Sequence, residues 1–440
     1  MDSMSTSELA RAGARTTTSD PAKAQGTALP WRVLLVLASA VFLSITIEML
    51  PTGLLPEMSA DLGVGEPLVG LLVSVFAFTV VVTSTPLTAI TRRMSRRTLL
   101  TAVLVLLAAS TLLSAVVPEY WMLIGVRVVG GIAHGVFWAL VGAYPARVVA
   151  EGQLGRAISI VLGGGTIALI AGVPLATALG QALGWRPAFA VVAGLTFAGA
   201  LLMRAVLPAD GATSTVREGA VVPDEPAASS AARAHAASAR PAGTTAVLVV
   251  CVVTAIVMTG QYAALTYIAP ILTDVVGAPA SAVAPLLFAS GIAGAAGLAV
   301  AGTRFARNGI RTLVLALAVI AASLVVLTSV PALWPAVFAY LVWGFAFGAV
   351  PPLLQTRLLQ AAAPERRDAA SALYTTGFNI GIGGGALIGG LLFGSFGVGS
   401  IPLAFVVLAV LAAVIVASST LRMSRVRVAA ATGSVRTSSA

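Results

Sequence analysis

Residues 32–55 read RVLLVLASAVFLSITIEMLPTGLL, and after Arg32 their only charged residue is Glu48. The run is long enough to cross the hydrocarbon core of a bilayer as a helix, and it lacks the alternating pattern of a barrel strand. The pattern predicts an all-α integral membrane protein with twelve transmembrane helices. The eleven further apolar runs, separated by short polar or proline-containing loops, lie at 67–90, 98–117, 121–144, 157–180, 187–207, 245–272, 281–303, 312–330, 334–357, 369–394 and 401–421.

The composition excludes a soluble fold. Of 440 residues, 58% are hydrophobic and 10% are charged, whereas a soluble domain carries roughly 25% charged residues. The single cysteine, Cys251, lies inside an apolar run, so we interpret it as a packing residue rather than a disulfide or zinc ligand. The first apolar run is too long for a signal peptide and has no clear cleavage site, so we expect it to be a retained helix.

An internal repeat divides the chain into two halves. Arg97-Thr-Leu reappears as Arg311-Thr-Leu, and the Gly131-x-x-x-Gly135 pair reappears as Gly344-x-x-x-Gly348. We predict two pseudo-symmetric six-helix bundles that rock about a central site. Their expected bounds are 32–207 and 245–421, with a disordered N-terminal tail at 1–31, a linker at 208–244 rich in Ala, Ser, Pro and Arg, and a basic tail at 422–440.

Basic residues concentrate in alternate loops. Arg92, Arg93, Arg96 and Arg97 share a face with the N-terminus, whereas the opposite loops hold several acids and Arg186 as their one basic residue. Because basic loops stay in the cytoplasm, we expect both termini to be cytoplasmic. The net charge of +10 is then a topology signal that would attract anionic lipid, not a nucleic-acid surface. The Arg- and Ala-rich composition indicates a bacterial source, so we expect a multi-pass protein of the bacterial plasma membrane.

Three ionisable residues stand out at membrane depth, namely Glu48, Arg127 and His134. From the helical rise, Glu48 and Arg127 lie about 13 Å and about 12 Å from the outer ends of their helices. They could therefore pair, and His134 follows on the same helical face as Arg127. A carboxyl group held between desolvation, which favours its neutral form, and a guanidinium, which favours the carboxylate, can load and release a proton. The alternative is a fixed Glu48–Arg127 salt bridge, and His134 is either a relay or a polar packing residue.

The second half carries aromatic residues where the first half carries charge. The approximate repeat counterparts of Glu48, Arg127 and His134 are Tyr262, Tyr340 and Phe347. We therefore expect proton coupling in the first half and much of the substrate surface in the second. For two of the candidate substrate-binding residues there is an alternative role: Asn379 could instead bridge helices, and Trp138 could instead anchor the helix at the membrane interface. The candidate substrate-binding residues are Trp138, Gln261, Tyr262, Tyr267, Tyr374, Thr375 and Asn379.

Several motifs carry a resemblance to a known family. Glu48-Met-Leu-Pro-Thr-Gly-Leu-Leu-Pro56, Arg127-x-x-Gly-Gly with His134-Gly, Gly172-Val-Pro174 and Phe378-Asn379-Ile-Gly are similar to signatures of the major facilitator superfamily. More narrowly, the chain resembles its twelve-helix bacterial drug–proton antiporters, which include sugar, nucleoside and chloramphenicol exporters. By this resemblance Glu48 and Arg127 form the coupling pair. The expected gating or packing residues are Gly172, Pro174, Arg92, Arg93, Gly302, Arg307, Gly309 and Arg311, with Thr91 and Ala306 where the family has aspartate.

The expected function is export of a small, drug-like molecule in exchange for protons by alternating access, in the manner of a multidrug-resistance antiporter. A sugar or nucleoside exporter and an uncoupled facilitator remain as alternatives, and topology leaves the direction of transport open. No His-Glu-x-x-His, Gly-x-Ser-x-Gly or nucleotide-binding loop is present, so we expect neither an enzyme nor an ATP-driven pump. The expected partners are the substrate, protons and lipid, without cofactor, metal or nucleic acid, and the monomer is expected to be functional.

Overall fold

The computed structural model describes residues 29–91, 94–150, 153–208, 242–301, 309–363 and 366–437, and every regular element in these ranges is helical. Twelve helices in them are long and apolar enough to cross a membrane, which confirms the predicted all-α fold. The linker and the N-terminal tail fall largely outside the described residues, as do Arg92, Arg93, Gly302 and Arg307. An even number of spans returns the chain to the face where it began. We call this the terminal face and the opposite one the distal face.

The first half contains six spans. They are α2 (Trp31–Gly53), α4 (Glu66–Ile90), α5 (Arg96–Val116), α6 (Tyr120–Val141), the composite span of α7 (Leu154–Ile167), the π-helical segment η5 (Ala168–Gly172) and α8 (Val173–Leu183), and α9 (Trp185–Val206). A short helix on the distal face, α3 (Leu55–Leu62), follows α2.

The second half repeats this arrangement. Its spans are α11 (Ala242–Thr266), α13 (Val283–Ala301), α14 (Gly309–Ser329), α15 (Leu333–Ala361), α16 (Arg367–Phe396) and α17 (Ser400–Thr437). Between α11 and α13, on the distal face, lie α12 (Ile268–Pro270), a π-helical segment η8 (Ile271–Val275) and a 3-10 turn η9 (Ala280–Ala282).

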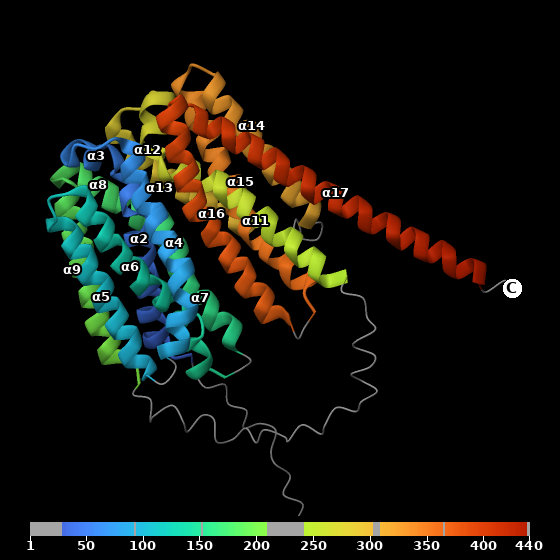
Figure 1. The fold of residues 1–440 in the computed structure, drawn as a ribbon, viewed down its shortest axis with the longest axis horizontal. Coiled ribbons are helices and arrows are strands. Elements are labelled where there is room, and N and C mark those ends of the chain that lie inside the picture. Colours follow the sequence, from blue (N-terminus) through green and yellow to red (C-terminus); the bar gives the residue numbers. More distant parts are fainter. Residues whose placement is uncertain are drawn as a thin grey trace, which may run out of the picture.

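The helices of each half pack mainly against one another, and the two halves lie side by side (Figure 1). Contacts of α2 with α11 and α12 join the two halves, which meet mainly along two helix pairs, α4 with α16 and α13 with η5 and α8. These are the second and fifth spans of one half against the fifth and second of the other, so the two contacts are equivalent under the predicted pseudo-symmetry.

Glycines set the closest helix contacts. A Cβ atom built on Gly164 of α7 would overlap the backbone carbonyl of Ala38 on α2, and one on Gly348 of α15 would overlap the carbonyl of Gly294 on α13. Small residues at such positions let two backbones approach, which is the main route to helix packing in lipid. Large apolar side chains such as Leu35, Val82 and Leu391 point outward and are exposed, which suits a lipid solvent.

Three predicted features of the helices differ from the structure or are refined by it. The predicted span 245–272 breaks at Tyr267, beyond which the chain forms α12 and η8. The last helix does not end at 421 but continues to Thr437, through a segment that contains the strong helix formers Arg, Met and Ala. Gly172 ends the π-helical segment η5 against α2, and Pro174 follows in the first turn of α8, where its missing N–H costs little.

Candidate functional site

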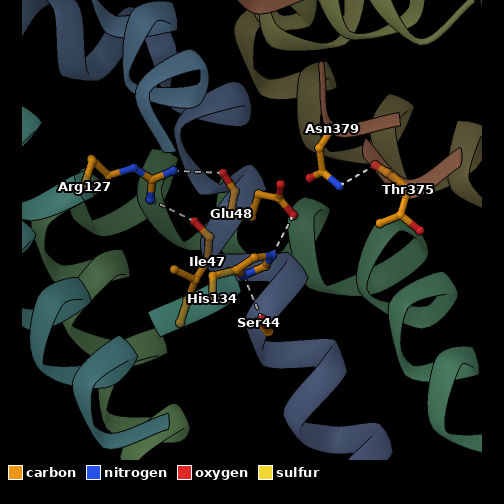
Figure 2. A network of polar contacts seen from close by, with 7 residues as sticks. All are labelled: Ser44, Ile47, Glu48, Arg127, His134, Thr375 and Asn379. Atoms are coloured by element: carbon orange, nitrogen blue, oxygen red, sulfur yellow. Dashed lines mark hydrogen bonds and ion pairs between the residues drawn. The ribbon is translucent and has the colours of Figure 1, made fainter. Parts of the chain in front are cut away.

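Glu48, Arg127 and His134 come together between α2 and α6 in the first half (Figure 2). Their exposed fractions are 6%, 3% and 3%, so all three are buried. The expected proximity of Glu48 and Arg127 is confirmed, since Nη2 of Arg127 donates to the backbone carbonyl of Glu48 at 3.1 Å. The contact differs from the alternative of a fixed salt bridge, because the guanidinium binds the main chain of α2 and not the Glu48 carboxylate.

Pro51 explains why the guanidinium binds the main chain. In a helix the carbonyl of Ile47 would accept a hydrogen bond from the N–H of residue 51, and Pro51 has none. Nη1 of Arg127 supplies the missing donor at 3.2 Å from the Ile47 oxygen. The guanidinium also lies over the ring of Phe76, 4.3 Å from its centroid. Arg127 is thus held at the proline of α2 by two carbonyl groups and an aromatic face.

The imidazole of His134 contacts Glu48 directly. Its Nε2 atom lies 3.5 Å from Oε2 of Glu48, and its Nδ1 atom lies 2.9 Å from Oγ of Ser44, one turn earlier on α2. With Nε2 protonated, the ring faces a carboxylate and accepts from Ser44; with Nδ1 protonated, it donates to Ser44 and faces a neutral carboxyl group. A proton transfer between Glu48 and His134 requires the 3.5 Å separation to shorten to hydrogen-bond distance.

Ser44 is a site residue that the sequence analysis missed. It is fully buried, and its hydroxyl reaches His134 on another helix. The available signal was its spacing of four residues from Glu48, which places both on one face of α2. Serines in helices commonly bond their own backbone, as Ser39 does to Leu35, so the spacing alone did not separate them.

Helix α16 of the second half lies opposite the cluster of Glu48, Arg127, His134 and Ser44. Figure 2 shows the side chain of Asn379 pointing toward Glu48 from the opposite half. Nδ2 of Asn379 donates to the carbonyl of Thr375 at 2.9 Å. Because this bond uses one of the two amide hydrogens, the other hydrogen and the amide oxygen remain for a partner. The hydroxyl of Thr375 is exposed and bonds the carbonyl of Ser371.

Aromatic side chains of α11 and α16 form a row beside Asn379. The ring centroids of Tyr262 and Phe378 are 6.3 Å apart, and those of Phe378 and Tyr374 are also 6.3 Å apart. Tyr262 lies within electrostatic range of Glu48. Phe378 was not among the predicted substrate residues, although it directly precedes Asn379 in the motif of this helix. The row therefore joins α11 to α16 within the second half, and the hydroxyl of Tyr374 donates to the carbonyl of Pro351 on α15 at 3.2 Å.

Two predicted substrate residues are engaged elsewhere. Gln261 accepts a hydrogen bond from the indole of Trp343 at 2.9 Å, which joins α11 to α15 inside the second half. Tyr267 is fully buried at the distal face, and its hydroxyl bonds two backbone carbonyls. Neither residue lies with the Glu48 cluster, because each is held by a helix contact of its own. In this conformation, Tyr267 presents no free group to a substrate.

The remaining predicted residues lie around the cluster or apart from it. Trp138 is half-buried one turn beyond His134, and its ring centroid lies 6.1 Å from that of the imidazole. Gly172 borders α2 through Thr46 and Phe42. Gly309 and Arg311 lie in the first turn of α14 on the terminal face, away from Glu48. The site thus unites the three ionisable residues, Ser44 and Trp138, with Asn379 of α16 opposite them (Figure 2).

The family model of the Major Facilitator Superfamily matches residues 37–374. A chloramphenicol efflux pump of Mycobacterium tuberculosis is 32% identical over 363 residues, covering 81% of this chain and 84% of that protein. A probable sugar efflux transporter of Mannheimia succiniciproducens is 28% identical over 356 residues, covering 81% and 85%.

Solved structures share the fold at low sequence identity. A bacterial homolog of the human lysosomal transporter Spinster, in an inward-facing conformation, superposes with a TM-score of 0.70 at 18% identity, over 88% of this chain and 96% of that one. A D-xylose–proton symporter superposes with a TM-score of 0.71 at 16% identity, over 88% and 97%. These matches and the twelve apolar spans confirm the expected family and membrane. The chain belongs to the Major Facilitator Superfamily, and it is a multi-pass transporter of the bacterial inner membrane rather than an enzyme.

Proposed function

We propose that this transporter exports a small, weakly polar or aromatic molecule in exchange for protons, and that Glu48 carries the proton. The observation that supports this most is the placement of Glu48. Its carboxyl group is buried in one half, lies 3.5 Å from an imidazole nitrogen and is faced by Asn379 of the other half. A titratable group at the interface of two moving halves can be exposed to each side of the membrane in turn.

The proposed cycle follows from the charge of Glu48. A carboxylate is costly to bury between closed halves, whereas the neutral acid is tolerated. Proton binding from one side therefore favours closure on that side and reorientation. On the other side, the proton leaves Glu48 by way of His134 and Ser44, which lies one turn closer to the terminal face. Substrate and proton then occupy the interface in alternation, which produces exchange.

The proposed direction of transport depends on which face of the membrane carries the arginines. We propose that the terminal face is cytoplasmic, because Arg96, Arg97, Arg147 and Arg366 lie at the ends of spans on that face. Under this orientation, protons entering from the distal face move down the usual gradient across a bacterial inner membrane. Their return to the cytoplasm would drive export of the substrate.

The proposed substrate class rests on Asn379 and on the aromatic row of α11 and α16. The aromatic row of Tyr262, Phe378 and Tyr374 provides ring surfaces, and Asn379 provides an amide donor and acceptor. Such a surface suits a flat neutral molecule with a few polar groups, of the kind that a chloramphenicol pump handles. A sugar is the second candidate, supported by the sugar efflux relatives.

The test is uptake into inverted membrane vesicles with and without an imposed pH gradient, for chloramphenicol, arabinose and a nucleoside. We expect one compound to accumulate with the gradient. In Glu48→Gln we expect this accumulation to fall by about ten-fold or more, because the coupling group is gone. The matched control is Glu119→Gln, which neutralises an exposed acid at the distal end of α6. Undiminished accumulation in Glu48→Gln at equal protein level would favour an uncoupled facilitator or a different proton carrier.

A further inference from the structure

The hydroxyl of Tyr267 joins the two halves of the transporter at the distal face. Its oxygen lies 3.3 Å from the backbone carbonyl of Pro67 on α4 and 3.2 Å from the carbonyl of Ala386 on α16. A phenol has one hydrogen to donate, so this hydrogen is shared between the first half and the second. A second side-chain hydrogen bond joins the halves at the same face, from Gln181 of α8 to the carbonyl of Ala280 at 2.9 Å.

Three glycines from the two helices make room for the phenol. A Cβ atom on Gly70 of α4 or on Gly390 of α16 would overlap the phenol oxygen, and one on Gly389 would press on the ring edge. The phenol is fully buried in this space and stacks edge-on against Phe393, with ring centroids 5.6 Å apart. The glycine of the first half is therefore as necessary to the fit as those of the second.

The backbone changes direction at Tyr267. Helix α11 ends at Thr266, Tyr267 has φ −104° and ψ 29°, and α12 begins at Ile268 before the π-helical segment η8. Helices kink at π-helical segments, and such segments are frequent at functional sites. The side chain that leaves this break reaches α4 of the other half, so a movement of the distal end of the second half must withdraw the phenol from Gly70.

We propose that Tyr267 is a gating residue of the transport cycle. Its phenol holds the distal ends of α4 and α16 together while the transporter is closed at that face, and opening there requires the phenol to leave the space beside Gly70. The proposal goes beyond proton coupling by Glu48 and does not depend on it, because the hydroxyl of Tyr267 donates to backbone carbonyls and not to Glu48.

The test is the distance distribution between two spin labels in the full-length protein in lipid nanodiscs. The labels are placed at Ala60→Cys and Ser281→Cys, exposed positions of α3 and η9 on the distal ends of the two halves, in a Cys251→Ala background. Neither substrate nor a proton gradient is needed. The result is therefore independent of whether the proposed antiport is correct.

Tyr267→Phe removes the shared hydrogen bond and keeps the ring. We expect the ratio of distally closed to distally open molecules to fall by about two- to ten-fold, in line with the loss of one buried neutral hydrogen bond. Gly70→Ala fills the space from the first half, and we expect a larger shift toward the open state. The controls are Tyr340→Phe, a buried tyrosine bonded to Ser290 within the second half, and Gly125→Ala, where a Cβ meets no neighbour within 4 Å.

The proposal is overturned if Tyr267→Phe gives the same distance distribution as the wild type and as Tyr340→Phe. If Gly70→Ala does not yield folded protein, the conservative Tyr267→Phe variant decides alone. Thermal unfolding of each variant in the same nanodiscs verifies that the populations compared are folded.

Discussion

Arg127 binds α2 through two backbone carbonyls, and that of Ile47 lacks its helical donor because residue 51 is proline. The planar guanidinium reaches both the Ile47 and the Glu48 oxygen while lying on the ring of Phe76. A lysine ammonium lacks this fork geometry. We therefore expect Arg127→Lys to keep the charge but to lower the transport rate by about ten-fold. Arg156→Lys, at an exposed arginine, is the control. Equal transport rates in the two variants would show that charge alone matters at position 127.

Ser44 is expected to matter for proton movement and not for the passage of substrate. Its hydroxyl bonds Nδ1 of His134, so Ser44→Ala removes the partner that orients the imidazole toward Glu48. We expect gradient-driven transport to slow by a few-fold, about the effect of losing one buried hydrogen bond. Exchange of labelled for unlabelled substrate should be unchanged. Equal slowing of both processes would indicate that Ser44 serves only to pack α2 against α6.

Glu57, on α3 outside the spans, predicts a pH dependence of stability. Burial raises the pKa of Glu57, and a hydrogen bond with its own backbone partly offsets this. A raised folded-state pKa means that the folded protein binds the proton more tightly than the unfolded chain. The stabilisation is therefore complete at low pH and is lost as the pH rises through the folded-state pKa. We expect Glu57→Gln to raise the melting temperature at about pH 8 and to leave it unchanged at about pH 4. Glu119→Gln, at an exposed acid, is the control.

Sequence reasoning found the ionisable residues of the site but not their contacts. Glu48, Arg127 and His134 were recognisable because charge is rare in a lipid-spanning helix. The contact of Arg127 with Ile47 could not be recognised from the sequence, because it involves a main-chain carbonyl that carries no sequence signal of its own. Tyr267 was assigned to the substrate surface for its polarity, and nothing local to it in the sequence indicated the glycines of two other helices that surround it.

At the scale of helices, neighbouring glycines provide a matched test of packing. A Cβ on Gly164 would overlap the carbonyl of Ala38, whereas one on Gly163 would meet nothing within 4 Å. We expect Gly164→Ala to destabilise the protein by about 1–3 kcal/mol, because backbone atoms must move apart. Gly163→Ala should be neutral or stabilising by up to about 1 kcal/mol, because alanine favours the helix. Thermal unfolding in detergent measures both. Equal behaviour of the two variants would contradict the close contact of α7 with α2.

Helix positions were predictable because lipid demands long apolar runs, and most of the predicted ends lie within a few residues of those observed. Two ends were not. The break at Tyr267 has no glycine or proline at the residue itself, and Pro270 three residues later did not mark it. The end of α17 was placed where apolar character stops, although a helix need not end where it leaves the membrane.

At the scale of the whole molecule, the repeat predicted the two halves but not which helices join them. Lipid and protein neighbours are equally apolar, so the faces that meet lipid and those that meet the other half look alike in sequence. The structure identifies α4 with α16, and α13 with η5 and α8, as the main joining pairs. In the proposed cycle the halves move across these pairs, and Glu48 faces Asn379 of α16 (Figure 2).

The most direct test of the account is proton flux driven by substrate in proteoliposomes that contain a pH-sensitive dye. A substrate gradient across wild-type proteoliposomes should move protons in the opposite direction. In Glu48→Gln we expect substrate exchange to continue while the proton flux falls to the level of protein-free liposomes. Proton flux at the wild-type level in Glu48→Gln would contradict the assignment of Glu48 as the proton carrier.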